Sequence, residues 1–173
     1  MRVEANGIAI EVEDTGPGED GRPAVLLVMG LGMQLIAWPP ALVQALVDAG
    51  FRVVRFDNRD IGWSQHFDHL GVPNLLWESA RHRVGLPVRC GYGLQDMARD
   101  SLGVLDALGI VRAHVVGVSM GGMIAQRMAL AAPQRVLSLA SIMSSSGARY
   151  LPGPKPHVLS ALLTRPQGRG EEA

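Results

Sequence analysis

Residues 114–133, HVVGVSMGGMIAQRMALAAP, decide the fold, because an apolar run, the string Gly-Val-Ser-Met-Gly and a helical pattern follow one another directly. A strand, a sharp turn and a helix in this order are what a nucleophile elbow requires. We expect Ser119 to take a strained backbone conformation at the turn, so Gly117 and Gly121 must lack side chains to avoid collision. The alternative is that Ser119 only caps the helix, but a cap does not need the flanking glycines. The pattern therefore favours Ser119 as a catalytic nucleophile.

A second glycine-rich turn follows the apolar run at residues 24–28, where the chain reads Met29-Gly30-Leu31-Gly32. An acyl-transfer site needs two N–H donors about 3 Å from the developing oxyanion. Met120 N–H at the start of the helix is one expected donor. Leu31 N–H is the second, provided that the strands before Leu31 and Ser119 are neighbours. Taken alone, this turn could simply end a strand.

Short apolar runs alternate with helix-length amphipathic segments along the chain. The hydrophobic pattern predicts a hairpin over residues 2–15 around Asn6-Gly7, strands at 24–28, 51–56, 113–118 and 136–143, and helices at 37–49, 93–108 and 120–132. Crossover helices between strands imply a parallel sheet. We therefore expect an α/β fold with a mostly parallel sheet, helices on both faces and an N-terminal hairpin. Residues 57–92 and 144–173 are rich in Gly and Pro and are typical of loops or excursions.

Residues 24–43 contain one polar side chain and could pass for a membrane span by hydropathy. Two glycines and the pair Pro39-Pro40 would break such a helix, so we expect no span. The first 16 residues carry acids and lack an apolar stretch behind a basic end, so they are no signal or transit peptide.

The composition excludes several function classes. The 173 residues carry 16 Lys plus Arg and 16 Asp plus Glu, so no net positive charge attracts nucleic acid or an anionic membrane. Cys90 is the single cysteine, which excludes an intrachain disulfide and a Cys-x-x-Cys metal or redox motif. We expect no metal site, no cofactor and a cytoplasmic location.

Three stretches together carry a resemblance to a known family: VLLVMGLGMQLIAWP at 25–39, FRVVRFDNRDIGWS at 51–64, and the stretch 114–133. The chain resembles α/β-hydrolase fold enzymes over residues 3 to about 165, and among them serine hydrolases similar to aclacinomycin methylesterase. Asp60 stands where many of these proteins have Gly, and Met29-Gly30 replaces the commoner His-Gly. Both departures occur in the methylesterase-like branch.

The resemblance implies that Ser119 is the nucleophile and that Leu31 and Met120 supply the oxyanion donors. It also implies that their strands are neighbours, with the active site outside the carboxyl ends of the strands. Met29, Met33 and Trp38 would line an apolar substrate pocket, together with Leu31, Trp63 and Met120, although such residues are more often core.

A serine hydrolase of this fold needs an acid and then a histidine after the serine. No Asp follows Ser119, and the one later histidine, His157, precedes the later acids, Glu171 and Glu172. We therefore expect the catalytic acid and base to be missing. Residues 1–146 are then the N-terminal part of a hydrolase core that stops before the last strands. Residues 147–173 are the start of a lid, which we expect to be mobile.

The remaining histidines are poor substitutes for the missing base. His114 belongs to the far end of the strand that leads to Ser119. The others, His66, His69 and His82, lie in the connection after residue 56 and are more simply explained as solvated side chains. We expect Asp57 to hold the turn that follows it rather than to orient a histidine.

These observations predict a serine hydrolase that cleaves small-molecule carboxylic esters through an acyl-enzyme, impaired in this chain. One alternative is a catalytically silent hydrolase-like fragment that binds a small ligand or another protein. A cofactor-free haloperoxidase or perhydrolase is the other, because it uses the same triad. The strand at 136–143 would leave an exposed sheet edge through which the chain could self-associate.

Overall fold

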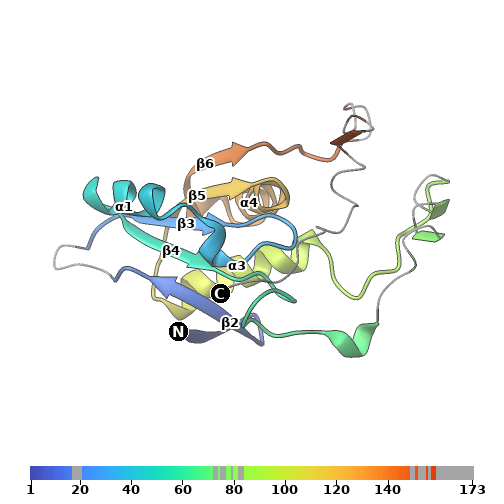
Figure 1. Ribbon diagram of the computed structural model, residues 1–173, viewed down its shortest axis with the longest axis horizontal. Helices are drawn as coiled ribbons and strands as arrows, with labels where there is room; N and C mark the ends of the chain where they lie inside the picture. The colour runs from blue at the N-terminus through green and yellow to red at the C-terminus, as the bar shows by residue number, and fades with distance from the viewer. Residues whose placement is uncertain are drawn as a thin grey trace, which may run out of the picture.

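The computed structural model describes residues 1–16, 21–71 and 84–148, together with the positions 74, 77–78, 80–81, 151, 155 and 157–158. These residues form a six-stranded sheet whose strand order is β1-β2-β4-β3-β5-β6 (Figure 1). The strands are β1 (Arg2–Ala5), β2 (Ile8–Asp14), β3 (Ala24–Val28), β4 (Arg52–Phe56), β5 (Ala113–Val118) and β6 (Val136–Ile142).

The predicted N-terminal hairpin is confirmed. β1 and β2 pair antiparallel, with Ala5 opposite Ile8. Asn6 and Gly7 connect them with φ of 53° and 75°. Positive φ at both central residues is the geometry of the two-residue turn that Asn-Gly favours. β2 then pairs antiparallel with β4 and joins the hairpin to the main sheet.

The other four strands run parallel in the order β4, β3, β5, β6. Leu26 of β3 lies between Val54 of β4 and Val115 of β5. At the carboxyl end of the sheet, Val28 pairs with Gly117. The prediction that the strands before Leu31 and Ser119 are neighbours is thus confirmed.

Helices cover both faces of the sheet, as the sequence predicts. The helix α1 (Pro40–Asp48) packs on one face over Val25, Leu27 and Val53. The helices α3 (Leu94–Ala107) and α4 (Met120–Ala131) pack on the opposite face over Leu26, Val28 and Val54. Successive strand residues therefore bury their side chains in two different clusters, so these strands are apolar throughout.

The segment 24–43 is a strand, a short 3₁₀ turn η1 (Leu35–Ala37) and the start of α1. α1 begins at Pro40, three residues later than predicted, because proline lacks an N–H and favours the first helical position. Within the described ranges, no helix is both long enough and apolar enough to cross a membrane.

Two excursions leave the sheet at the carboxyl ends of the parallel strands (Figure 1). One follows β4, includes the 3₁₀ turn η2 (Asp68–Leu70) and returns into α3. The other follows β6, which comes after the 3₁₀ turn η3 (Pro133–Arg135). Most of the predicted lid segment 147–173 lies outside the described residues, so the predicted domain boundary stays a prediction.

Candidate functional site

Ser119 lies between the last residue of β5 and the first residue of α4, with φ 54° and ψ −121°. For a non-glycine residue such a conformation costs about 1–3 kcal/mol and persists where the surroundings hold it. Its N–H donates to Ile142 O at 2.9 Å, and its carbonyl accepts from Gly122 N at 3.0 Å. Its side chain makes no capping hydrogen bond to α4, and an ordinary N-cap has extended φ and ψ. Both features argue against the interpretation of Ser119 as a plain cap.

The glycines around Ser119 leave no room for side chains. A Cβ on Gly117 would lie 2.3 Å from Gly121 O, and a Cβ on Gly121 would lie 2.1 Å from Val28 O. Gly30 lies against Ser119 itself, because a Cβ there would be 3.3 Å from the Ser119 Cβ. The strands β3 and β5 and the start of α4 therefore meet backbone to backbone at this turn.

Two backbone N–H groups border the turn. Met120 N–H belongs to the first residue of α4, where the unpaired amides of a helix give a partial positive charge. Leu31 N–H follows Gly30 directly, in a turn closed by Met33 N–H and Gly30 O at 3.5 Å. Among the described residues, neither Leu31 N–H nor Met120 N–H donates a hydrogen bond. Both groups are therefore available to a hydrogen-bond acceptor from outside these residues, and their role as oxyanion donors stays a prediction.

The residues expected to line an apolar pocket differ in burial. Met29 and Trp38 are buried, with 6% and 4% of their surface exposed, in the cluster beneath α1. In contrast, Leu31, Met33 and Trp63 are exposed, and Met120 packs partly against the cluster on the opposite face. Met29 and Trp38 therefore belong to a core cluster, and the substrate pocket itself stays a prediction.

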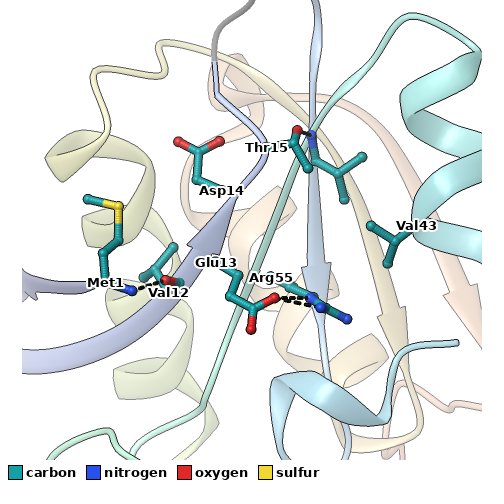
Figure 2. Close-up of a pocket in the computed structure, with 8 residues that line it drawn as sticks. Met1, Val12, Glu13, Asp14, Thr15, Val43 and Arg55 are labelled. Atoms are coloured by element: carbon teal, nitrogen blue, oxygen red, sulfur yellow. Dashed lines mark hydrogen bonds and ion pairs between the residues drawn. The ribbon is translucent and has the colours of Figure 1, made fainter. Parts of the chain in front are cut away.

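A cavity of about 360 Å³ lies away from Ser119, on the face of the sheet that carries α1 (Figure 2). Figure 2 shows Glu13 and Arg55 joined to each other at the cavity, with Arg55 Nε 2.8 Å from Glu13 Oε2. It is lined by residues of β2, β4 and α1, together with Met1 and Thr15. Because β3 separates β4 from β5 in the sheet, this cavity does not belong to the Ser119 turn.

The loop after β4 holds its neighbours through buried polar side chains. Asp57 accepts hydrogen bonds from Leu35 N–H at 2.6 Å and from Trp63 N–H at 3.2 Å. The prediction that Asp57 holds its own turn is thus confirmed. Asn58 donates to Met29 O at 2.9 Å. Sequence reasoning missed Asn58, although a polar residue just after a buried strand beside β3 is a usable signal.

The same loop is also tied to α3. Arg59 makes two hydrogen bonds of 2.6 Å with Asp100, and both side chains are buried. Asp60 has φ 64°, which lies in the left-handed region that glycine adopts most readily. Its carboxylate accepts from Phe67 N–H at 2.6 Å and from the Tyr92 hydroxyl. Burial raises the pKa of Tyr92 to about 12, and the hydrogen bond to Asp60 adds to the effect.

No histidine or carboxylate hydrogen-bonds to Ser119 in the part of the chain that the structure describes. His114 lies at the opposite end of β5, with Nδ1 2.7 Å from Ser138 Oγ. His66 is exposed and contacts Gly62 O, and His69 is exposed near the Phe67 ring. His82 lies outside the described residues, and His157 is exposed. The described residues also contain no group of three His, Cys, Asp or Glu that could hold a metal ion.

Comparison with known proteins identifies relatives of this fold. Residues 23–167 match the model of the alpha/beta hydrolase fold family. Rhodomycin D methylesterase DauP of Streptomyces sp. (strain C5) is 34% identical over 131 residues, which cover 76% of this chain and 38% of DauP. The putative non-heme bromoperoxidase BpoC of Mycobacterium tuberculosis (strain H37Rv) is 31% identical over 140 residues, or 81% of this chain and 43% of BpoC.

A solved structure gives the same result. The enol-lactonase from Burkholderia xenovorans LB400 superposes with a TM-score of 0.60 at 28% identity, covering 79% of this chain and 44% of the lactonase. The chain thus spans about two fifths of the length of these proteins. The match to the family model, the strand order and the strand-turn-helix around Ser119 agree, and the chain belongs to the alpha/beta hydrolase fold family.

Proposed function

We propose that this chain carries the nucleophile half of a serine hydrolase that cleaves small-molecule carboxylic esters. The observation that carries the proposal is the positive φ of Ser119 at the turn from β5 into α4, with Gly30 packed against it. Such a turn exposes the serine oxygen at the top of the sheet, where a substrate can reach it. The methylesterase relative supports esters as the substrate class.

In the proposed reaction, Ser119 Oγ attacks the ester carbonyl carbon and a base takes the hydroxyl proton. The carbonyl oxygen becomes an oxyanion that accepts hydrogen bonds from Leu31 N–H and Met120 N–H. Collapse of this intermediate breaks the bond to the alcohol, which leaves with a proton, and water then hydrolyses the acyl-serine. Within the described ranges, no histidine or carboxylate hydrogen-bonds to Ser119 and could act as the base or its acid partner. We therefore propose that the esterase activity of this chain alone is impaired.

The experiment is hydrolysis of p-nitrophenyl acetate by the 173-residue chain and by Ser119→Ala. We expect slow release of p-nitrophenol, since loss of triad members leaves a residual acceleration of roughly 10³–10⁴ over water. Ser119→Ala should remove any acyl-enzyme, seen as a mass increase of one acetyl group on the parent chain. Equal rates and no acetylation in both proteins would contradict the proposal.

Two alternatives predict different outcomes. A perhydrolase or haloperoxidase, favoured by the similarity to BpoC, would form peracetic acid from acetate and hydrogen peroxide in a Ser119-dependent way. A silent ligand-binding or protein-binding module would show neither acetylation nor peracid formation. Rapid turnover that Ser119→Ala abolishes would instead point to a base within the chain, and His66, His69 and His82 should then be replaced in turn.

We also propose a cytoplasmic location. Cys90 is an exposed free thiol, which suits a reducing compartment.

A further inference from the structure

Two hydrogen bonds join the loop after β4 to the loop after β3. Asn58 Nδ2 donates to Met29 O at 2.9 Å, and Leu35 N–H donates to Asp57 Oδ1 at 2.6 Å. Both polar side chains are 2% exposed. Buried hydrogen bonds of this kind are costly to lose, because the partner left behind is neither solvated nor paired. Residues 29–35, which we name the oxyanion loop, are therefore fixed at both ends.

Between these two points the oxyanion loop makes one tight turn. Met33 N–H lies 3.5 Å from Gly30 O, and Gly32 has φ 70°. Gly30 O and Leu31 N–H belong to the same planar trans peptide and point in opposite directions. Because Gly30 O is turned toward Met33, Leu31 N–H is turned the other way. The direction of Leu31 N–H is therefore set by how residues 29 and 35 are held.

We propose that Asp57 and Asn58 are positioning residues that aim Leu31 N–H at the oxyanion formed on Ser119, an inference that rests on the function proposed above. Neither residue touches the reacting atoms in this assignment. Asn58 fixes the peptide that precedes Gly30, and Asp57 fixes the end of the turn. Gly30 in turn contacts Ser119, so a shift of the oxyanion loop changes the distance from Leu31 N–H to the substrate oxygen.

The surroundings of Asp57 leave it little freedom to move. Its second carboxylate oxygen accepts from Trp63 N–H, and its carbonyl accepts from Ser64 Oγ at 2.6 Å. A Cβ on Gly62 would lie 2.0 Å from Asp57 Oδ2, so a glycine is needed there for the carboxylate to fit. The Asp57 carboxylate therefore accepts hydrogen bonds from backbone N–H groups of two loops, which are its own loop and the oxyanion loop.

The test compares Asn58→Ala and Asp57→Asn with Ser64→Ala as the matched control. Ser64 is buried in the same loop and bonds Asp57 O and Glu11 N–H, but it makes no hydrogen bond to residues 29–35. Asp57→Asn keeps the shape of the side chain if Asn58→Ala fails to fold. The first measurement is the backbone ¹H–¹⁵N NMR spectrum, recorded for the parent and every variant in a Leu139→Lys background, because a charge on the edge of β6 is expected to keep the chain monomeric.

We expect the Gly30 and Leu31 amide signals to shift and broaden in Asn58→Ala and Asp57→Asn, and to stay in place in Ser64→Ala. The second measurement is the rate of Ser119 acetylation by p-nitrophenyl acetate. The maximal rate should fall about tenfold to hundredfold, with a half-saturating concentration within about twofold of the parent value, because an oxyanion donor acts in the transition state.

The outcomes separate the two proposals. Unchanged Gly30 and Leu31 signals in both variants, or equal changes in Ser64→Ala, would overturn the positioning role. Displaced signals with an unchanged acetylation rate would also overturn it, because Leu31 N–H would then not assist the reaction. Absence of any Ser119-dependent acetylation in the parent chain would overturn the proposed function and with it the catalytic purpose of the positioning, while the NMR spectra would still report on how the loop is held.

Discussion

The strands β3 and β6 flank β5 on opposite sides, and both are short, apolar and parallel to it, yet their surroundings differ. All five residues of β3 are buried. None of the seven residues of β6 is fully buried, and Leu137, Leu139 and Ile142 are 43%, 39% and 43% exposed. Similar side chains thus contribute very different amounts of buried surface to the two sides of one strand.

The cause lies in what surrounds each strand. β3 is paired on both edges, with α1 on one face and α3 and α4 on the other. Among the described residues, β6 is paired on one edge, and α4 contacts it. Hydrophobic stabilisation follows the apolar area removed from water, so β3 contributes to folding far more than β6 does. The oxyanion loop follows β3, so it lies on the better buried side of β5.

The largest difference between the two sides is expected for the adjacent glycines of α4. Gly121→Ala places a Cβ 2.1 Å from the backbone oxygen of Val28, on the β3 side. Gly122→Ala places one 2.6 Å from the side chain of Ser144, on the β6 side. The backbone of β3 is held in the sheet and cannot move to relieve the collision, whereas the Ser144 side chain can rotate. We expect urea unfolding to show losses of about 3 kcal/mol or more for Gly121→Ala and about 1 kcal/mol for Gly122→Ala.

Gly93→Ala is the control for these two variants, because nothing lies within 4 Å of the added Cβ. It should cost less than about 1 kcal/mol, which is the range for a substitution without collision at a helix start. Equal losses for Gly121→Ala and Gly122→Ala would show that the two sides of β5 are equally rigid.

A smaller difference is expected for one leucine from each strand. Leu27 is 0% exposed and Leu139 is 39% exposed. Truncation of a buried leucine to alanine removes its transfer energy and leaves a cavity, which costs about 2–5 kcal/mol. We expect that range for Leu27→Ala and less than about 1 kcal/mol for Leu139→Ala, from the midpoints of urea denaturation. A comparable loss at Leu139 would mean that β6 is covered in solution.

Most of the fold could be predicted because the local signals are strong. The strands at 24–28 and 113–118 were predicted to the residue, since apolar runs bounded by turn residues define them. The helix α1 begins at Pro40 and not at residue 37, because proline favours the first helical position, a preference that hydrophobic periodicity does not reveal. Which side chains of residues 29–38 lie in the core could not be predicted, because Met29 and Trp38 are buried in a cluster that includes Val53 of β4, and no local pattern reveals that contact.

The candidate site likewise has one part that the local sequence predicts and another part that it does not. The strand, turn and helix around Ser119 are local, so the sequence locates them. The contacts of Asn58 with Met29 and of Asp57 with Leu35 join residues 29 and 22 positions apart, and no local pattern encodes such pairs. Only the strand order, which brings β4 beside β3, makes them neighbours.

One edge of β6 pairs with no other strand among the described residues, and this edge gives the last and smallest expected effect. The residues of β6 include no charge and no proline, and both of these protect natural sheet edges from pairing with other chains. We expect the 173-residue chain to self-associate at micromolar concentration, measured by size-exclusion chromatography with light scattering. Leu139→Lys should shift the chain toward monomer because a lysine must be desolvated in a paired edge, whereas Leu139→Ala should reduce association less. A parent chain that stays monomeric at every concentration, or a Leu139→Lys variant that associates as strongly as the parent, would show that β6 is not the interface.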